Sequence, residues 1–441
     1  MRLKHLIYKR AICRCAAVAM MLMGSVAFAD SSPAQWQSPF ENADARHVNY
    51  DSLSLNDIVG LVAKNNPILK SLKWNLESSE GNLRQAGLRF NPELNLELEE
   101  FGWDAPGFKE TEMTIILSQK FELFGQRAAR KQHAQANIKY TRWNNQKSVF
   151  DLFLDAKLRY LRLTHAQDKA CLAQEALELS QSIQSDIENR NKIGAVHQSE
   201  LLLSQLELQS AQLELNEAIC DRKYASLELS ALWNASDSGI VVANCGIDKH
   251  DCLKNIAGLD ISIDSSREIT EMIFRRGMID SESRLLGAEA NPAITYSGGI
   301  KRLQGDKANS FIMGLSLPLP FVNRNQGARA GLQAEINALD LEINDKKARV
   351  SSTVRSQIGK IVQLDEKMEM IDSLLLPTAE RTYESLTQAY NAGRIPYTSL
   401  LEGKRALIGL RFDKNDIFLN IKELQIEVER TIGIPLESIK N

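Results

Sequence analysis

Beyond residue 29 the sequence has no apolar run that approaches the ~18 residues of a membrane-spanning helix. A chain that crosses a membrane without such a helix needs β-strands in a closed barrel, which pairs every backbone group. The sequence also lacks a phosphate-binding loop, a nucleophile elbow and a paired-carboxylate signature, and its histidines are scattered. It therefore predicts no catalysis, no cofactor and no resident metal ion.

The chain has little excess charge, but its first 29 residues carry basic side chains and no acidic ones. Five basic residues lie in residues 1–29, ahead of the apolar run Ala16 to Val26 and the triplet Ala27-Phe28-Ala29. This order is typical of a secretory signal peptide cut before Asp30, whereas a membrane anchor would need a longer apolar run. Without these five residues the formal charge changes from −3 to −8. A mildly acidic chain of this kind lacks the basic surface that nucleic-acid binding requires.

Residues 126–193 contain neither proline nor glycine. At ~1.5 Å per residue they predict a helix on the order of 100 Å long, which needs packing partners along its whole length. Gly194 breaks the pattern, and a shorter return helix is predicted over residues 197–233.

Strict alternation marks residues 311–319, where one face of the predicted strand carries Phe311, Met313, Leu315, Leu317 and Leu319. A similar strand-to-helix pattern occupies residues 113–130. Three landmarks then repeat at nearly constant spacing: Asn91-Pro92 with Asn291-Pro292, Gln126 with Gln326, and Gly194 with Gly393. Together they indicate an internal duplication.

The duplication gives the predicted organisation. It comprises a signal peptide (1–29), an extended arm (30–53), a first repeat (54–245), a linker (246–265), a second repeat (266–434) and a tail (435–441). The first repeat holds a hairpin at 92–123, the long helix 126–193 and the return helix 197–233. The second holds a hairpin at 292–321, a long helix 326–390 and a return helix 396–432.

Local signals refine these elements. Ser54 and Asp57 form a predicted capping box at the start of the first repeat. Met278 is taken as the counterpart of Pro67, so the first helix of the second repeat is expected to be about three turns shorter. Each hairpin has strands of ~11 residues, the length that a tilted strand needs to cross a bilayer. A soluble hairpin on a sandwich is the alternative, but no further strands follow.

Cys171 lies 23 residues before Gly194 and Cys220 lies 26 after it. In an antiparallel helical hairpin they are nearly level, so we expect them to face one another, either disulfide-bonded or as two buried thiols.

Cys245 and Cys252 bracket a short loop that contains His250 and Asp251. A disulfide is the preferred interpretation for an exported chain, and a metal site is the alternative.

The phrases FELFGQRAAR and LSLPLPFVNRNQGARA at the two strand-to-helix joints, and YNAGRIPYTSLLEGKRAL at the second turn, resemble the TolC-like outer-membrane efflux proteins. Within that family the chain looks closest to the CzcC-like channels of heavy-metal resistance. The resemblance implies a mixed α and β fold in which a homotrimer forms one twelve-stranded β-barrel, with four strands from each copy, and a periplasmic α-helical barrel. Four strands are in any case too few to close a barrel alone.

The resemblance also assigns roles at the helical turns. The tips that meet an adaptor protein would be Arg190, Gly194 and Ala195 in the first repeat and Tyr390, Gly393, Arg394 and Ile395 in the second. The acidic constriction of the family corresponds to Ser399 and Glu402, so only one acid is kept. Three copies of Glu402 would form a cation-selective ring, or Glu402 is simply a solvated helix charge. An ion pair between Glu200 and Arg394 could close the tip.

The sequence thus predicts a passive exit duct in the outer membrane of a Gram-negative cell, with a periplasmic helical extension. An RND-type inner-membrane pump and a periplasmic adaptor would deliver the substrate, divalent heavy-metal cations. Two alternatives stay open: a drug or protein export channel of the same fold, and a structural coiled-coil protein of the envelope.

Overall fold

The computed structural model describes residues 53–100, 110–235 and 266–433, which form two compact units. The sheet unit consists of residues 71–100, 110–147 and 268–348, and the tip unit consists of residues 53–70, 148–235, 266–267 and 349–433. Each unit contains segments of both sequence repeats. The repeats are therefore interleaved and do not form separate compact domains. The predicted signal peptide, linker and tail lie outside the described residues, as do Cys245 and Cys252.

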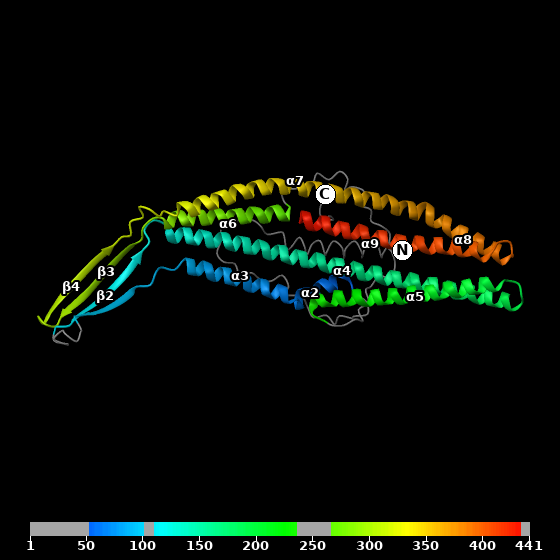
Figure 1. The fold of residues 1–441 in the computed structure, drawn as a ribbon, viewed down its shortest axis with the longest axis horizontal. Helices are drawn as coiled ribbons and strands as arrows, with labels where there is room; N and C mark the ends of the chain where they lie inside the picture. The colour runs from blue at the N-terminus through cyan, green and yellow to red at the C-terminus, as the bar shows by residue number, and fades with distance from the viewer. Residues whose placement is uncertain (1–52, 101–109, 236–265, 434–441) are drawn as a thin grey trace, which may run out of the picture. The chain divides into compact units, whose positions relative to one another are not determined.

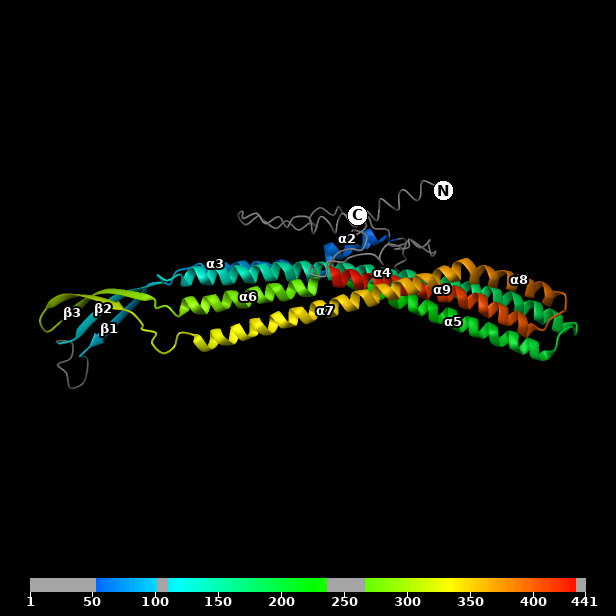
Figure 2. The ribbon, with the colours of Figure 1, turned by 90° about the horizontal axis from the view of Figure 1, so that it is seen from above.

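The sheet unit carries four antiparallel strands in the order β1-β2-β3-β4; Figure 2 labels the first three, and Figure 1 labels β4 beside β3. They are β1 (Glu93–Glu99), β2 (Glu112–Phe121), β3 (Ile294–Leu303) and β4 (Ala308–Ser316). The register aligns Leu96 with Ile115, Ile115 with Ile300, and Ile300 with Phe311. Because alternate side chains point to opposite faces, one face of the sheet is apolar from edge to edge.

The opposite face is polar and carries an ionic cluster. Lys301 on β3 binds Glu99 at 3.1 Å and also binds Glu112. The predicted alternation in the second hairpin is confirmed, since Phe311 and Met313 expose 87% and 92% of their surface on the apolar face. β4 ends at Ser316, two residues before Pro318, which lacks the N–H that a ladder needs.

Helices follow the strands in the same unit (Figure 1). α3 (Pro67–Ala86) packs beside the first turns of α4 (Gln126–Lys192), where Asn145 donates to the Leu72 carbonyl at 2.8 Å. α6 (Arg267–Glu289) meets α4 through His133 and Ser281 and meets α7 (Gln326–Met370) through Arg276 and Asp340. Fixed contacts therefore join both repeats within this unit.

The expected shortening of the first helix in the second repeat is wrong. α6 has 23 residues, against 20 in α3. Its first residue, Arg267, stands 200 positions after Pro67, so the register of the other landmarks also holds here, and Met278 was the wrong counterpart.

The tip unit is entirely helical among its described residues. α2 (Leu55–Asn65) starts at Ser54, where the predicted capping box with Asp57 is confirmed. α5 (Gln198–Ser230) continues into the short η2 (Ala231–Trp233), and α8 (Leu376–Asn391) leads to α9 (Tyr397–Ile432). None of the helices in the described ranges combines the length and the apolar character of a membrane span.

The second long helix is interrupted, whereas the sequence predicted it to be continuous over residues 326–390. A π-turn, η5 (Ile371–Leu375), separates α7 from α8. Pro377 follows it and cannot donate a backbone hydrogen bond. The hydroxyls of Ser373 and Thr378 bond to the carbonyls of Glu369 and Leu374, each at 2.7 Å. Side-chain hydroxyls thus add donors to helical carbonyls on both sides of the proline.

The two described cysteines do not face one another. Cys171 and Cys220 are both exposed, and no disulfide joins them. The α4–α5 contact is made instead by a set of buried small and apolar residues: Ala170, Ala173, Leu177, Ala211, Leu215 and Ala218. These residues lie at the same heights along α4 and α5 as the two cysteines, as predicted. The cysteine side chains, however, lie on the exposed faces of the helices and not on the faces that pack together.

Candidate functional site at the helical turns

Both long helices end in the same backbone motif. The Ala195 N–H donates to the Arg190 carbonyl at 2.8 Å and the Gly194 N–H donates to the Asn191 carbonyl at 2.9 Å. The second turn repeats this pair of bonds from Arg394 and Gly393. Gly194 and Gly393 have φ values of +74° and +68°, which residues with a side chain rarely adopt. The two glycines therefore make the tight reversals at the tips possible.

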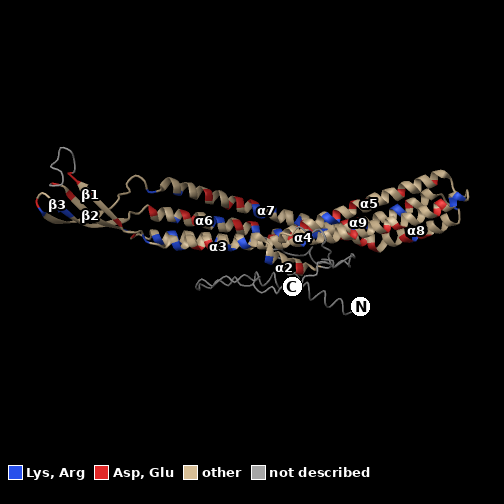
Figure 3. Ribbon diagram, turned by 90° about the horizontal axis from the view of Figure 1, so that it is seen from below, with Lys and Arg blue, Asp and Glu red and all other residues tan. Residues whose placement is uncertain are grey.

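Arg190 joins the first turn to the second. Its guanidinium donates to the Tyr390 carbonyl at 3.3 Å and to Asn391 Oδ1 at 2.8 Å, and it lies 5.0 Å from the centre of the Tyr390 ring. Figure 3 shows basic residues gathered at this end of the helices. The contact links the end of α4 directly to the end of α8.

A small apolar core lies just behind the turns. It contains Ile187 from the first hairpin and Tyr390, Tyr397, Leu400 and Leu401 from the second. The rings of Tyr390 and Tyr397 are 6.1 Å apart. Burial raises the pKa of Tyr397 to about 12, with a smaller contribution from the charge of Glu207. This core closes the two hairpins against one another within one chain.

Gly403 allows α8 and α9 to approach closely at the same level. A Cβ atom at Gly403 would lie 2.5 Å from Cδ1 of Leu386, which belongs to the partly buried edge of this core. A larger residue would therefore require the Leu386 side chain to move.

Glu200 approaches Tyr390, not Arg394. Glu200 Oε2 and the Tyr390 hydroxyl are both buried, and neither forms a hydrogen bond of good geometry with the part of the chain that the structure describes. Burial first, and the charge of Glu200 next, raises the pKa of Tyr390. Among the described residues no ion pair joins Glu200 to Arg394, whose side chain is exposed.

The predicted constriction residues lie on the first turns of α9. Glu402 is exposed and Ser399 is half-buried, and Ile395 lies at the edge of the apolar core. Glu402 is therefore free within its own chain to face solvent or another copy of the protein.

Sequence reasoning missed a buried cluster behind these residues. Lys404 on α9 contacts Ser180 on α4 and Glu207 on α5, and Glu207 also binds Arg405 at 2.7 Å. The signal was present: Lys404 continues the buried stripe of Tyr397, Leu400 and Leu401 at helical spacing. A lysine in such a stripe needs a buried partner.

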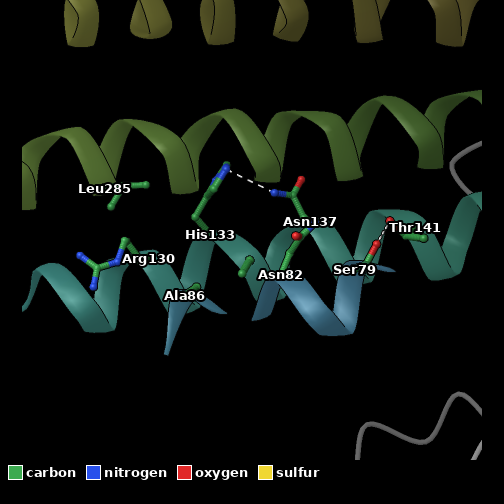
Figure 4. Close-up of a pocket in the computed structure, with 9 residues that line it drawn as sticks. Ser79, Asn82, Ala86, Arg130, His133, Asn137, Thr141 and Leu285 are labelled. Carbon is green, nitrogen blue, oxygen red and sulfur yellow. Dashed lines mark hydrogen bonds between the residues drawn. The ribbon is translucent and has the colours of Figure 1, made fainter. Parts of the chain in front are cut away.

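The sheet unit contains a separate polar groove of about 520 Å³ between α3, α4 and α6. Figure 4 shows Arg130 at one end, a bond between His133 and Asn137, and a bond between Ser79 and Thr141. Arg130 is already paired with Glu122, so the groove offers mainly neutral hydrogen-bonding groups. Among the described residues, no group of three or more His, Cys, Asp or Glu could hold a metal ion.

These hairpins, turns and strands have counterparts in known proteins. Among solved structures, CusC gives a TM-score of 0.73 at 15% identity, over 91% of this chain and 98% of CusC. The outer membrane protein VceC of Vibrio cholerae gives a TM-score of 0.71 at 15% identity, over 86% of this chain and 96% of VceC. The fold is thus that of the outer-membrane channels with long helical hairpins, and the predicted fold class is confirmed.

The sequence comparisons agree with the fold. Residues 58–235 match the family model described as outer membrane efflux protein. The cobalt-zinc-cadmium resistance protein CzcC of Cupriavidus metallidurans is 25% identical over 395 residues, which cover 86% of this chain and 90% of that protein. The chain is thus similar to the outer membrane efflux proteins over residues 58–235 and to a cobalt-zinc-cadmium resistance protein over most of its length.

Proposed function

We propose that three copies of this chain form the exit duct of a tripartite efflux system. An RND-type pump in the inner membrane and a periplasmic adaptor would deliver the substrate, and the duct would conduct it passively outward. The apolar face of the four-stranded sheet supports a lipid-facing position, since four strands expose this face continuously. We propose no catalytic activity for the chain.

The proposed substrate is a divalent heavy-metal cation. The observation that carries this choice is the similarity to the cobalt-zinc-cadmium resistance protein, which extends over nearly the whole of both chains. A duct conducts its substrate without binding it tightly, so the cation needs no dedicated protein site.

The proposed gate is the pair of turns. Arg190, Glu200 and Tyr390 would hold the tips together in the closed duct, and the apolar core around Tyr397 would support them. Glu402 from three copies would form the cation-selective constriction beside Ser399. The exposed turn residues Gly194, Ala195, Gly393 and Arg394, with Arg190, Tyr390 and Ile395 behind them, would present the tips to the adaptor.

A deletion strain tests this function. We expect loss of the chain to lower tolerance to cobalt, zinc and cadmium, and an intact copy to restore it, while tolerance to lipophilic drugs stays unchanged. Restoration of drug tolerance alone would instead identify a drug duct. Extraction by salt without detergent would contradict the membrane channel and favour a structural coiled-coil protein.

A further inference from the structure

A buried lysine, two residues after Glu402 of the predicted constriction, joins three helices. Only 4% of the Lys404 side chain is exposed. Its ammonium donates to Ser180 Oγ on α4 and to Glu207 Oε1 on α5, the latter at 3.2 Å. Ser180 in turn donates to the Ala176 carbonyl at 2.7 Å. The second hairpin is thus attached to both helices of the first hairpin by one side chain.

The charges in this cluster are unequally exposed. Glu207 is 12% exposed and also binds Arg405, whose side chain is 62% exposed. Burial alone would raise the pKa of Glu207, but the bonds from Arg405 and Lys404 hold it below its usual value. Burial lowers the pKa of Lys404. Removing Lys404 would therefore leave Glu207 paired with Arg405, not as an isolated buried charge.

Lys404 and the constriction occupy opposite sides of the same helix. Two residues correspond to about 200° of helical rotation, so Glu402 projects away from the side that Lys404 holds. The first turns of α9 have little other polar support, because the N-cap Pro396 makes no side-chain capping bond. The polar attachment of this part of α9 therefore comes from buried Lys404 and from the more exposed Arg405–Glu207 pair, beside the apolar contacts of Tyr397, Leu400 and Leu401.

We propose that Lys404 is a positioning residue for the gate: its bonds to Ser180 and Glu207 fix the start of α9 so that Glu402 is held at the constriction. The inference rests on the proposed duct function. It differs from the gate described above, because Lys404 contacts neither the turns nor the conducted ion and acts through the placement of α9.

Hydrogen–deuterium exchange on the detergent-solubilised full chain tests the attachment without reference to transport. In Lys404→Met we expect amides of residues 397–402 to exchange at least tenfold faster, while residues 417–432 in the α7–α9 core exchange as in wild type. Arg405→Met is the matched control, because it removes the exposed partner of the same glutamate and should change exchange in residues 397–402 less than twofold. Ser180→Ala removes only the α4 partner and should give an intermediate increase.

Conductance in planar bilayers then separates positioning from packing. We expect Lys404→Met to raise the mean conductance at least twofold and to weaken the preference for cations over anions, with Lys404→Arg closer to wild type. Unchanged exchange in Lys404→Met would overturn the inference, and so would faster exchange with unchanged conductance and selectivity. If Lys404→Met does not fold, Ser180→Ala decides by the same two readouts. A wild-type chain that forms no pore would contradict the proposed function, and faster exchange in the variant would still establish the attachment.

Discussion

The guanidinium of Arg190 lies 5.0 Å from the centre of the Tyr390 ring and donates to the Tyr390 carbonyl at 3.3 Å. One residue of the first turn thus covers the last turn of α8. The two are 200 positions apart in the sequence, and their contact depends on both hairpins being in place.

Arg190→Ala should shift the duct toward the open state. Loss of the ring contact and of the bonds to α8 removes about 1–2 kcal/mol, a factor of roughly 5 to 30 in the ratio of closed to open forms. Single-channel recording measures that ratio. Lys192→Ala is the control, since the ion pair that Lys192 forms within the described ranges is with Glu188 on its own helix. Equal opening in both variants would contradict a specific role for Arg190.

Glu200 and Arg394 can be separated by charge reversal. Because one carboxylate oxygen of Glu200 is buried beside Tyr390 and Arg394 is exposed, Glu200→Lys should admit a large antibiotic, whereas Arg394→Glu should not. Growth on a large, normally excluded antibiotic gives the readout. If the double variant Glu200→Lys with Arg394→Glu regained resistance, the two residues would form an ion pair across the tip of the assembled duct.

Glu402→Ala should reduce cation selectivity. In the proposed trimer, three carboxylates around one axis would attract cations, so their removal should lower the cation-to-anion permeability ratio roughly severalfold. Reversal potentials in a salt gradient measure this ratio. Glu217→Ala on α5, also exposed but far from the turn, is the control. Equal effects of the two substitutions would show that Glu402 is an ordinary solvated charge.

The raised pKa of Tyr397 predicts that the folded chain loses stability at alkaline pH. Its pKa is raised from 10.0 to about 12 in the folded chain, so the unfolded chain releases the proton at lower pH. The stabilisation is complete below pH 10 and is lost as the pH rises toward 12, by on the order of 2 kcal/mol. Thermal unfolding at pH 9 and pH 11 should show a smaller drop in Tyr397→Phe than in wild type. Identical drops would exclude this tyrosine as the source.

The orientation of the α4–α5 hairpin is open to a direct test. Ala218 is fully buried, and Cys220 on the same helix is exposed. Ala218→Leu should overpack the contact and destabilise the chain by about 1–3 kcal/mol, whereas Cys220→Leu should leave the melting temperature almost unchanged. The opposite order would restore the arrangement in which the cysteines face one another.

The sequence was most informative where a backbone requirement selects a residue type. Gly194 and Gly393 marked both turns because the left-handed conformation favours glycine. Alternation marked the strands because one face of the sheet is apolar. Counting residues from Gly194 predicted that Cys171 and Cys220 lie at similar heights along the helical hairpin. It did not predict which way their side chains point, because this depends on which faces of α4 and α5 pack together.

Other features depend on contacts between distant segments. The burial of Lys404 requires Ser180 and Glu207, which come from two other helices. Glu200 meets Tyr390 because the two hairpins share one apolar core, a contact that neither local sequence encodes. The π-turn η5 requires the balance of backbone and side-chain bonds around Pro377, which the residue pattern alone does not determine.

The strand order has a consequence for how the protein is made. Among the described residues β1 pairs only with β2 and β4 only with β3, so a single chain offers one unpaired strand on each side of the sheet. Unpaired edges beside a wide apolar face promote aggregation in water. A newly exported chain would therefore need a chaperone to shield these strands until other copies arrive, and its folded yield should increase with the local concentration of the chain.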